Sequence, residues 1–196
     1  MSELPPQYIE IHTERFVLRS AQPSDARVEF ENWTLDSLIA EMMNANSEKW
    51  SLEKQRTFFT AGLVRPDQRI IGIFPKEINS LIGFFILKLN KALGNFTIST
   101  LIGNKDWRGQ DVMGECSDAI YKLMFEGADY HKAKANILPS NKAMIWNLAQ
   151  TKIWKREGRL RKQLRNFQNN ERLDVLVYGL LKSDWQKNIH AQVLAK

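Results

Sequence analysis

The sequence is poor in the residues that build disulfide frameworks and metal centres. Its single cysteine, Cys116, rules out an internal disulfide and a cysteine-based zinc site. The three histidines, His12, His131 and His190, are scattered and lack the spacing of paired ligands on one helix face, so we expect no metal. Cys116 falls on the apolar face of a predicted helix, which favours a packed thiol over a nucleophile.

Long apolar runs are also missing. No stretch approaches the roughly 20 apolar residues that a membrane span requires, and the first residues lack the basic and apolar regions of a secretory signal. We therefore expect a cytoplasmic protein that does not enter membranes. A length of 196 residues with 43% apolar content suits one globular domain. The net charge of +6 and the pI near 9.4 suit an anionic ligand, a nucleic acid or an acidic protein.

Both standard phosphate-binding loops, the glycine-rich dinucleotide loop and the Walker loop, are missing as well. The sequence offers instead the stretch 95–127. Its first part, Asn95 to Gly103, is rich in β-branched residues and predicts a strand. Its last part, Val112 to Gly127, has helical spacing and ends at a glycine. A strand that leads through a short loop into a helix exposes N–H groups at the first helical turn, which suits a phosphate.

The loop of this stretch resembles the pyrophosphate loop of the GNAT superfamily of N-acetyltransferases, which bind acetyl-CoA. The family signature, R/Q-x-x-G-x-G/A, corresponds to residues 108–113. Residues 102–107 (IGNKDW) resemble the segment that precedes this signature in the Rim-type branch, which includes ribosomal-protein N-acetyltransferases. The resemblance assigns cofactor binding to Leu101, Ile102, Gly103, Arg108, Gly109, Gln110, Asp111, Val112, Met113 and Gly114.

Asp111 and Met113 stand where the family motif has small residues. Asp111 is also a good helix N-cap, which would compete for the N–H groups, and its charge would repel a diphosphate. Two interpretations stay open: a loop that binds CoA, and a loop that only starts a helix. Glu115, in the predicted first turn, is interpreted as structural because the helix dipole favours it there.

Three further segments resemble family motifs. Residues 13–19 (TERFVLR) resemble the T-x-R-L-x-L-R opening of Rim-type enzymes. Residues 153–161 resemble the family's G-F-x-x-E-G-x-x-R strand, and residues 173–181, followed by Trp185, resemble its closing strand. Four motifs in the family's order are more specific than any one of them.

The resemblance implies an α/β (α+β) GNAT fold with a mixed, mostly antiparallel sheet of six to seven strands. Helices would cover both faces, and the sheet would splay between the fourth and fifth strands. We expect a single domain over residues 1–196, with a core at about 8–185 and a short tail at 186–196. The expected elements are a strand at 8–19, a helix starting at Ser24 or Asp25, helical segments between 35 and 63 interrupted near 44–46, strands at 69–75, 81–90 and 95–103, a helix at 112–127, a strand at 131–138, a helix at 141–151 and strands at 154–161 and 173–181.

The resemblance also implies a reaction. Acetyl-CoA, as co-substrate, would give its acetyl group to a primary amine, a protein N-terminus or a small amine, by direct attack in a ternary complex. The pantetheine arm would pair with the strand edge at Leu101 to Gly103, and a main-chain donor there would stabilise the oxyanion. Asn141, at the start of a later helix, corresponds to an Asn that contacts the CoA arm.

The sequence contains no evident general acid or base. The helix position where many family members carry Tyr or Ser offers only Asn147. Ser99 and Tyr178 are the other candidate catalytic residues, as proton relays through water. The alternative bases, whose pattern is typical of solvated surface charges, are Glu31, Asp36 and Glu41.

Two other functions stay open. A degenerate GNAT fold would bind acyl-CoA without transferring the acetyl group, which Asp111 favours. The basic segment Lys152 to Arg165 would suit RNA or a ribosome, although such a strand is usually a solvated face, so a nucleic acid is not favoured. The positive net charge argues mildly against a polycationic acceptor. The sequence is compatible with a monomer or a homodimer.

Overall fold

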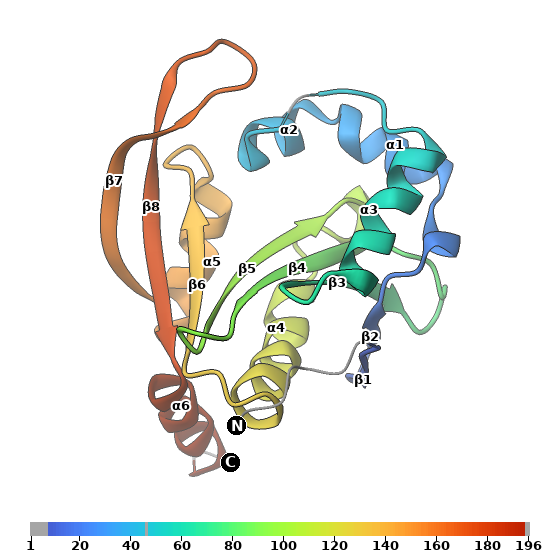
Figure 1. Cartoon of the computed structure of the whole chain (residues 1–196). Coiled ribbons are helices and arrows are strands. Elements are labelled where there is room, and N and C mark those ends of the chain that lie inside the picture. Colours follow the sequence, from blue (N-terminus) through green and yellow to red (C-terminus); the bar gives the residue numbers. More distant parts are fainter. Residues whose placement is uncertain (1–7, 46, 195–196) are drawn as a thin grey trace.

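The computed structural model describes residues 8–45 and 47–194 and contains one open, eight-stranded sheet with helices on both faces (Figure 1). The strand order is β1-β2-β3-β4-β5-β6-β8-β7. The strands are β1 (Glu10–His12), β2 (Phe16–Ser20), β3 (Gln68–Pro75), β4 (Gly83–Asn90), β5 (Asn95–Ile102), β6 (Lys132–Ile137), β7 (Lys155–Arg165) and β8 (Arg172–Leu181). The helices are α1 (Val28–Leu35), α2 (Ser37–Met43), α3 (Leu52–Val64), α4 (Val112–Lys122), α5 (Lys142–Thr151) and α6 (Lys182–Leu194). The expected mixed, mostly antiparallel GNAT fold is confirmed, with one strand more than the six to seven expected.

The additional strand arises because the predicted strand at 8–19 is a hairpin. β1 and β2 pair antiparallel, with His12 opposite Val17. The Thr13 hydroxyl accepts a hydrogen bond from the Phe16 N–H at 3.0 Å, which closes the turn. The prediction of a single strand was therefore wrong. The side chain of Thr13 stabilises a reversal of the chain direction that the alternation of apolar residues does not indicate.

The sheet splays between β5 and β6, which are the fourth and fifth of the predicted strands. These parallel strands pair only from Asn95↔Lys132 to Thr97↔Lys134. Beyond that point β5 continues to pair with β4, and β6 continues to pair with β8. The expected splay is confirmed, and Figure 1 shows β5 and β6 diverging from a common base.

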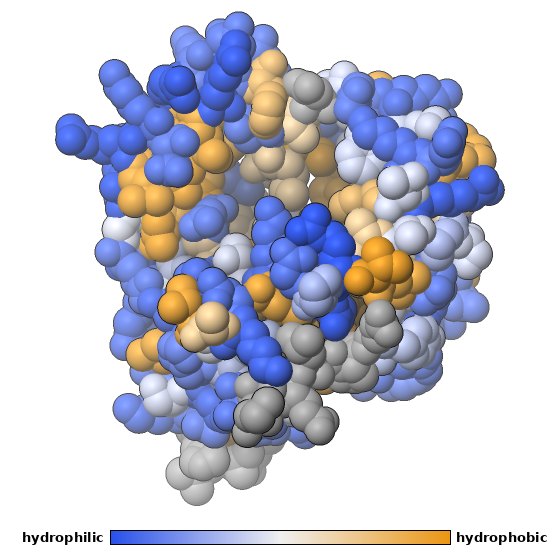
Figure 2. Space-filling view, in the orientation of Figure 1, coloured by the Kyte–Doolittle hydropathy of each residue, from blue (hydrophilic) through white to orange (hydrophobic). Residues whose placement is uncertain are grey.

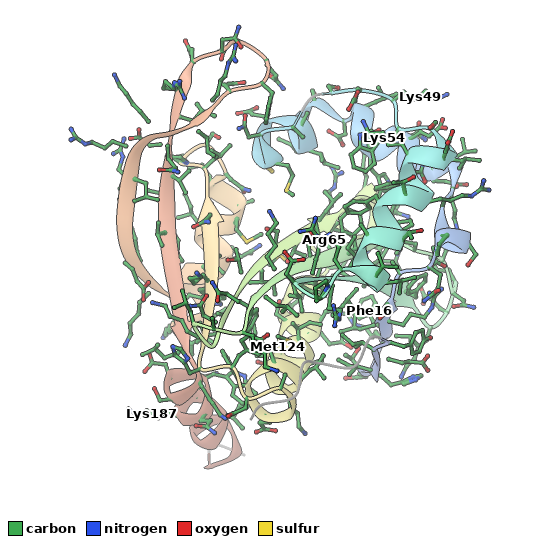
Figure 3. The ribbon with its side chains drawn as sticks, in the orientation of Figure 1. Phe16, Lys49, Lys54, Arg65, Met124 and Lys187 are labelled. Atoms are coloured by element: carbon green, nitrogen blue, oxygen red, sulfur yellow. The ribbon has the colours of Figure 1, made fainter. Side chains whose placement is uncertain are left out.

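Two hydrophobic cores lie on opposite faces of the sheet. Successive side chains of a strand point to opposite faces, so β3 sends Ile71 and Ile73 into the large core with α4, and Ile70 and Phe74 into the smaller core with α1 and α3. The buried side chains of Phe16 and Met124, labelled in Figure 3, belong to the large core. Each face of the splayed sheet therefore has its own apolar support.

The first helical region differs from the expected one. Residues Pro23–Asp25 form only a 3-10 turn, and α1 begins at Val28 without a side-chain cap. The buried Asp25 instead pairs with Arg19 through two short contacts of 2.7 and 2.8 Å and accepts from the Gln22 N–H at 2.7 Å. The predicted capping of a helix by Ser24 or Asp25 was therefore wrong, because Asp25 is used to neutralise a cation of β2.

The later elements follow the sequence closely. α3 ends at Val64, before Pro66, and the helix that starts at Val112 runs through a π-helical turn (Leu123–Gly127) to the predicted glycine stop. The last helix, α6, begins at Lys182, before the expected tail at 186–196, and its Trp185 is buried and donates to Asp118 at 3.2 Å. In the part of the chain that the structure describes, none of the helices combines the length and apolar character that a membrane crossing needs.

Gly103 is predicted to be intolerant of a side chain. A Cβ at this position would fall within the ring of Trp33, whereas a Cβ at Gly158 would meet open space. We expect Gly103→Ala to lower the free energy of unfolding by about 1–3 kcal/mol, the usual effect of overpacking, and Gly158→Ala to change it by less than about 0.5 kcal/mol. Urea denaturation measures both. An equal loss in the two variants would contradict the close approach of α1 to the end of β5.

Candidate functional site

The divergence of β5 and β6 opens a groove that passes between the two halves of the sheet. Its outer part is a cavity of about 460 Å³ between α2, the 108–113 loop and α5, and its inner part is a cavity of about 150 Å³ between β5 and β6. Figure 2 shows the molecule hollowed at this place. The two cavities are one groove, because they share the lining residues Met42, Met43, Thr100, Met113, Asn141 and Met144.

The free edge of β5 faces this groove. The Gly103 N–H donates to the Ile82 carbonyl at 2.9 Å, so Gly103 and Leu101 turn their main-chain groups toward β4. By the alternation of an antiparallel ladder, Ile98, Thr100 and Ile102 turn theirs toward the groove. Of the edge predicted at Leu101 to Gly103, only Ile102 therefore faces the groove, and its carbonyl accepts from Arg108. Thr100 is a groove-facing residue that the sequence analysis missed.

The first turn of α4 lies at the mouth of the groove. Gly109 and Asp111 have left-handed backbones with φ of 80° and 54°, a conformation natural to glycine and tolerated by aspartate. The Asp111 side chain makes no capping hydrogen bond. Among the described residues, no acceptor is found for the N–H groups of Val112, Met113 and Gly114. Asp111 therefore occupies the N-cap position without the predicted side-chain cap, and its carboxylate lies against Gly114.

Glu115 fastens the start of α4 to the β1–β2 turn. It accepts from the Thr13 hydroxyl at 2.5 Å, from the Arg15 N–H at 2.8 Å and from Arg15 Nε at 2.7 Å. Burial alone would raise the pKa of the Glu115 carboxyl, but the bonds from Arg15 and Thr13 outweigh it and hold that pKa below its usual range. Glu115 therefore has a structural role, as predicted: it holds the first turn of α4 against the β1–β2 turn.

Arg108 holds the end of β5 in place. Its Nε donates to the Ile102 carbonyl at 3.0 Å, and its Nη2 donates to the Gly103 carbonyl at 3.0 Å and to Asp36 at 3.1 Å. Desolvation would raise the pKa of Asp36, but the bond from Arg108 and the N–H of Leu38 lower it. The guanidinium is therefore engaged by β5 and α2. Arg108, which the resemblance assigns to cofactor binding, thus positions the loop.

The candidate catalytic residues are not gathered at one point. Ser99 lines the inner cavity, on the face of β5 opposite to that of Ile98 and Thr100. Asn147 lines the outer cavity, with its Nδ2 3.9 Å from the sulfur of Met113. Tyr178 lines neither cavity, because its side chain is buried in the large core. The sequence could not distinguish these environments.

Asn141, which the resemblance assigns to the CoA arm, caps α5 and lies in the groove. Its Oδ1 accepts from the Met144 N–H at 3.0 Å and so caps α5. It also lines both parts of the groove, and its amide group is therefore beside any ligand that lies there.

The comparison with known families agrees with this geometry. The model of the acetyltransferase (GNAT) domain matches residues 15–149. The chain belongs to the GNAT acetyltransferase family. None of the curated proteins compared with the chain matches it significantly.

Solved structures share the fold of this GNAT domain at low sequence identity. A GNAT-family acetyltransferase from Bacillus anthracis has a TM-score of 0.75 at 19% identity, covering 89% of this chain and 99% of the other. Spermidine N-acetyltransferase from Vibrio cholerae, solved with CoA and spermine, has 0.74 at 17%, covering 88% and 98%. Ribosomal-protein-S5-alanine acetyltransferase from Vibrio fischeri has 0.76 at 16%, covering 90% and 98%.

Tyr121 of α4 is a groove residue of this GNAT domain that the sequence analysis missed. It lines the inner cavity, and its hydroxyl accepts from Trp154 Nε1 at 3.2 Å. Burial raises the pKa of Tyr121 to about 12, and the bonds from Trp154 and Ser117 only partly offset this. The sequence signal was Ser117 and Tyr121, four residues apart on an otherwise apolar helix face.

Glu115→Gln is expected to destabilise the protein in a pH-dependent way. The folded pKa of Glu115 lies below its unfolded value of about 4.3. Its stabilising effect is therefore present above that value and is lost as the pH falls through the folded pKa. We expect a loss of about 1–2 kcal/mol at pH 7, typical of hydrogen bonds to a charged group, which shrinks below about pH 4.

Urea denaturation of both proteins between pH 3 and 8 measures this difference. The control is Glu126→Gln, because Glu126 is an exposed carboxylate in the π-helical turn (Leu123–Gly127) that follows α4. The stability of this variant should follow that of the wild type. A loss that is independent of pH would show that the Glu115 contacts act through packing alone.

Proposed function

We propose that this GNAT domain transfers the acetyl group of acetyl-CoA to the nitrogen of a primary amine, by direct attack in a ternary complex. The observation that supports this most is the groove between β5 and β6, which has the N–H groups of the first turn of α4 at its mouth. A free strand edge and a free helix start, joined by one loop, suit a molecule with a diphosphate and an amide-containing arm.

In this proposal the CoA diphosphate lies against the N–H groups of Val112, Met113 and Gly114. The adjacent N–H groups of Gly109 and Gln110 belong to the same turn, and the helix dipole adds its positive end. Arg108 contributes by fixing this turn to β5. The pantetheine arm then runs along Thr100 and Ile102 as an added strand would, beside Asn141.

The reaction forms a C–N bond and breaks the C–S bond of the thioester. The amine must be neutral, since an ammonium ion has no lone pair, and its proton leaves after attack. A main-chain N–H of the β5 edge, at Thr100 or Ile102, would stabilise the oxyanion. The sulfur departs as a thiolate, and the phenol of Tyr121 stays protonated at neutral pH and can serve it as a donor. Ser99 is retained as a water relay, whereas the core position of Tyr178 leaves it a packing role.

We place the chain in the Rim-type branch as a part of this proposal. Its T-x-R opening supplies Thr13 and Arg15, and both bind Glu115 just after the loop. The opening motif and the loop motif therefore meet in this contact, which fixes the position of the first turn of α4. The ribosomal-protein and spermidine acetyltransferases share the fold, and their acceptors represent two options for the acceptor here.

Acetyl transfer should be measurable with purified protein. With acetyl-CoA and a panel of amines, we expect release of free CoA thiol that depends on the amine and matches N-acetyl product one to one. Initial rates should give intersecting patterns, because both substrates must be bound. Binding of CoA without product would instead support an acyl-CoA-binding protein, and RNA binding that weakens steeply with salt would support the basic β7 strand as its functional face.

Asp111→Gly should tighten the binding of CoA. The substitution removes a carboxylate from the first turn, and glycine accepts the left-handed backbone without strain. Removing one exposed like charge is worth up to about 1 kcal/mol, so we expect the dissociation constant to fall by about fivefold in isothermal titration. Asp111→Asn removes only the charge and should give the same gain. Unchanged affinity in both variants would show that the diphosphate does not lie near Asp111.

A further inference from the structure

The pairing of β7 with β8 sorts the side chains of their hairpin onto two faces. Residues directly opposite each other in an antiparallel pair share a face. Leu164, which lines the inner cavity, lies opposite Leu173, and Leu160 lies opposite Val175, which lines the same cavity. The pairs on the other face are Arg156↔Tyr178, Arg159↔Leu176 and Arg165↔Arg172. The hairpin is therefore apolar toward the groove and rich in arginine on the opposite face.

Most of the excess positive charge of the chain lies in this hairpin. Residues 155–174 contain seven Lys or Arg and three Asp or Glu, which gives a net charge of +4 within a total of +6. Lys155 pairs with Asp184, and Arg159 pairs with Asp174 at 2.6 Å. In the part of the chain that the structure describes, the hairpin cations without a carboxylate partner are Arg156, Arg161, Lys162, Arg165 and Arg172. These charges repel one another, and an anionic ligand that covers them relieves the repulsion.

The free edge of β7 is unsuited to a further strand. Its register with β8 is interrupted between Arg156 and Gly158 and again between Leu160 and Leu164. Lys162, inside the second interruption, has a left-handed backbone with φ of 53°. Bulges and cations on an edge strand oppose pairing with another strand, and a second copy of this chain would also bring its own cations. The expected ligand therefore binds the side chains of β7 and not its main-chain groups.

The arrangement of the cations suits a chain of phosphates. We call the arginines of the cationic face, together with Arg161 of the second interruption, the arginine strip; its members are Arg156, Arg159, Arg161, Arg165 and Arg172, and all are exposed. The planar guanidinium group binds phosphate through two parallel hydrogen bonds. From residue 156 to 165 the strand extends over roughly 25–30 Å. This length exceeds a single phosphate group and matches several successive ones, and Figure 1 shows the hairpin reaching beyond the end of β6.

An exposed aromatic ring distinguishes a nucleic acid from an acidic protein. Phe167, two residues beyond Arg165, is 58% exposed in the hairpin loop. The loop is held in place, because the Phe167 N–H donates to Asn44 Oδ1 at 3.3 Å and Arg165 Nε donates to Asn170 Oδ1 at 2.9 Å. Unpaired bases stack on such rings beside a cationic groove. A ring fixed at the end of an arginine strip favours a single strand, whose bases are free to stack.

We propose that the arginine strip binds a single-stranded nucleic acid, with its phosphates on the guanidinium groups and a base on the ring of Phe167. This inference is independent of the proposed function, because none of these residues lines either part of the groove. The nucleic-acid site and the groove lie on opposite faces of the same two strands. RNA and DNA share the chemistry that the strip recognises, and the experiment separates them.

Fluorescence anisotropy with a labelled oligouridylate of about 12 nucleotides tests the proposal on the full chain. The variant Arg156→Gln/Arg161→Gln/Arg172→Gln removes three cations whose side chains make no hydrogen bond or ion pair with the described residues. Each lost phosphate contact lowers the slope of log K against log salt by about 0.7, so the slope should fall by about 2. At about 0.1 M salt the affinity should fall by at least tenfold.

A matched variant controls for the net charge. Arg56→Gln/Lys91→Gln/Lys122→Gln removes the same number of cations from exposed positions on α3, the β4–β5 turn and α4. Its affinity for the oligouridylate should stay within about threefold of the wild type, with an unchanged salt slope. Equal losses in the two triple variants would show that only the total charge matters, and the arginine strip would be overturned as a site. Circular dichroism confirms that both variants are folded.

Phe167→Ala tests the stacked base separately from the phosphates. We expect a loss of about tenfold at every salt concentration with an unchanged slope, because stacking is not a charge contact, and Phe167→Trp should restore the affinity. An oligothymidylate of the same length is the second probe. Binding of either strand through the strip supports the proposal, and the tighter one identifies the source. Polyglutamate that displaces the oligouridylate as well as unlabelled oligouridylate does, or tighter binding of a duplex, would overturn it.

Discussion

The parting of β5 and β6 is the constraint on which the site depends. Two parallel strands normally satisfy each other's main-chain groups, and a buried group without a partner is unfavourable. Here each strand keeps its outer neighbour along its length, β4 for β5 and β8 for β6, and the two share bonds only at their first residues. The split therefore leaves both half-sheets intact. It leaves the main-chain groups of Thr100 facing the groove, next to Ile102, whose carbonyl accepts from Arg108.

The loop after β5 is held in a conformation that few residues adopt. Gly109 and Asp111 both have positive φ, and such a backbone persists only where neighbouring contacts fix it. Those contacts come from distant parts of the chain: Arg15 donates to the Gln110 carbonyl at 3.1 Å, and Glu115 binds the turn that carries Arg15. The helix start is thus fixed from the side of β1 and β2, which leaves the side toward the groove open.

The sequence was sufficient for the parts of the fold that local patterns determine. The strand at 95–103, the helix from Val112 and the stop at Gly127 follow from β-branched residues, helical spacing and a glycine, and the structure confirms them. The pairing of Thr13 and Arg15 with Glu115 spans about a hundred residues of sequence, and no local pattern indicates it.

The same reasoning explains which features of the site the sequence could not indicate. Arg108 looks like a free cation in the sequence because its partner, Asp36, lies 72 residues earlier. Asp111 looks like a cap because aspartate usually is one, whereas with its left-handed backbone its carboxylate makes no hydrogen bond to the N–H groups of the first turn. Tyr178 and Ser99 both sit on strands of similar pattern, and only the direction of each side chain separates a core residue from a groove residue.

The groove is also bounded by α2, which is tied at both ends. At its start Asp36 accepts from Arg108, which in turn holds the end of β5. At its end the Asn44 side chain donates to the Arg165 carbonyl at 2.9 Å and accepts from the Phe167 N–H at 3.3 Å, both in the β7–β8 hairpin. This short helix therefore connects the two half-sheets across the opening that their strands leave. The Asn44 bonds are exposed, and such bonds contribute only about 0.5–1.5 kcal/mol each. The start of α2 is held by an ion pair whose carboxylate is only 10% exposed, whereas its end is held by exposed hydrogen bonds, so the end is the weaker of the two attachments.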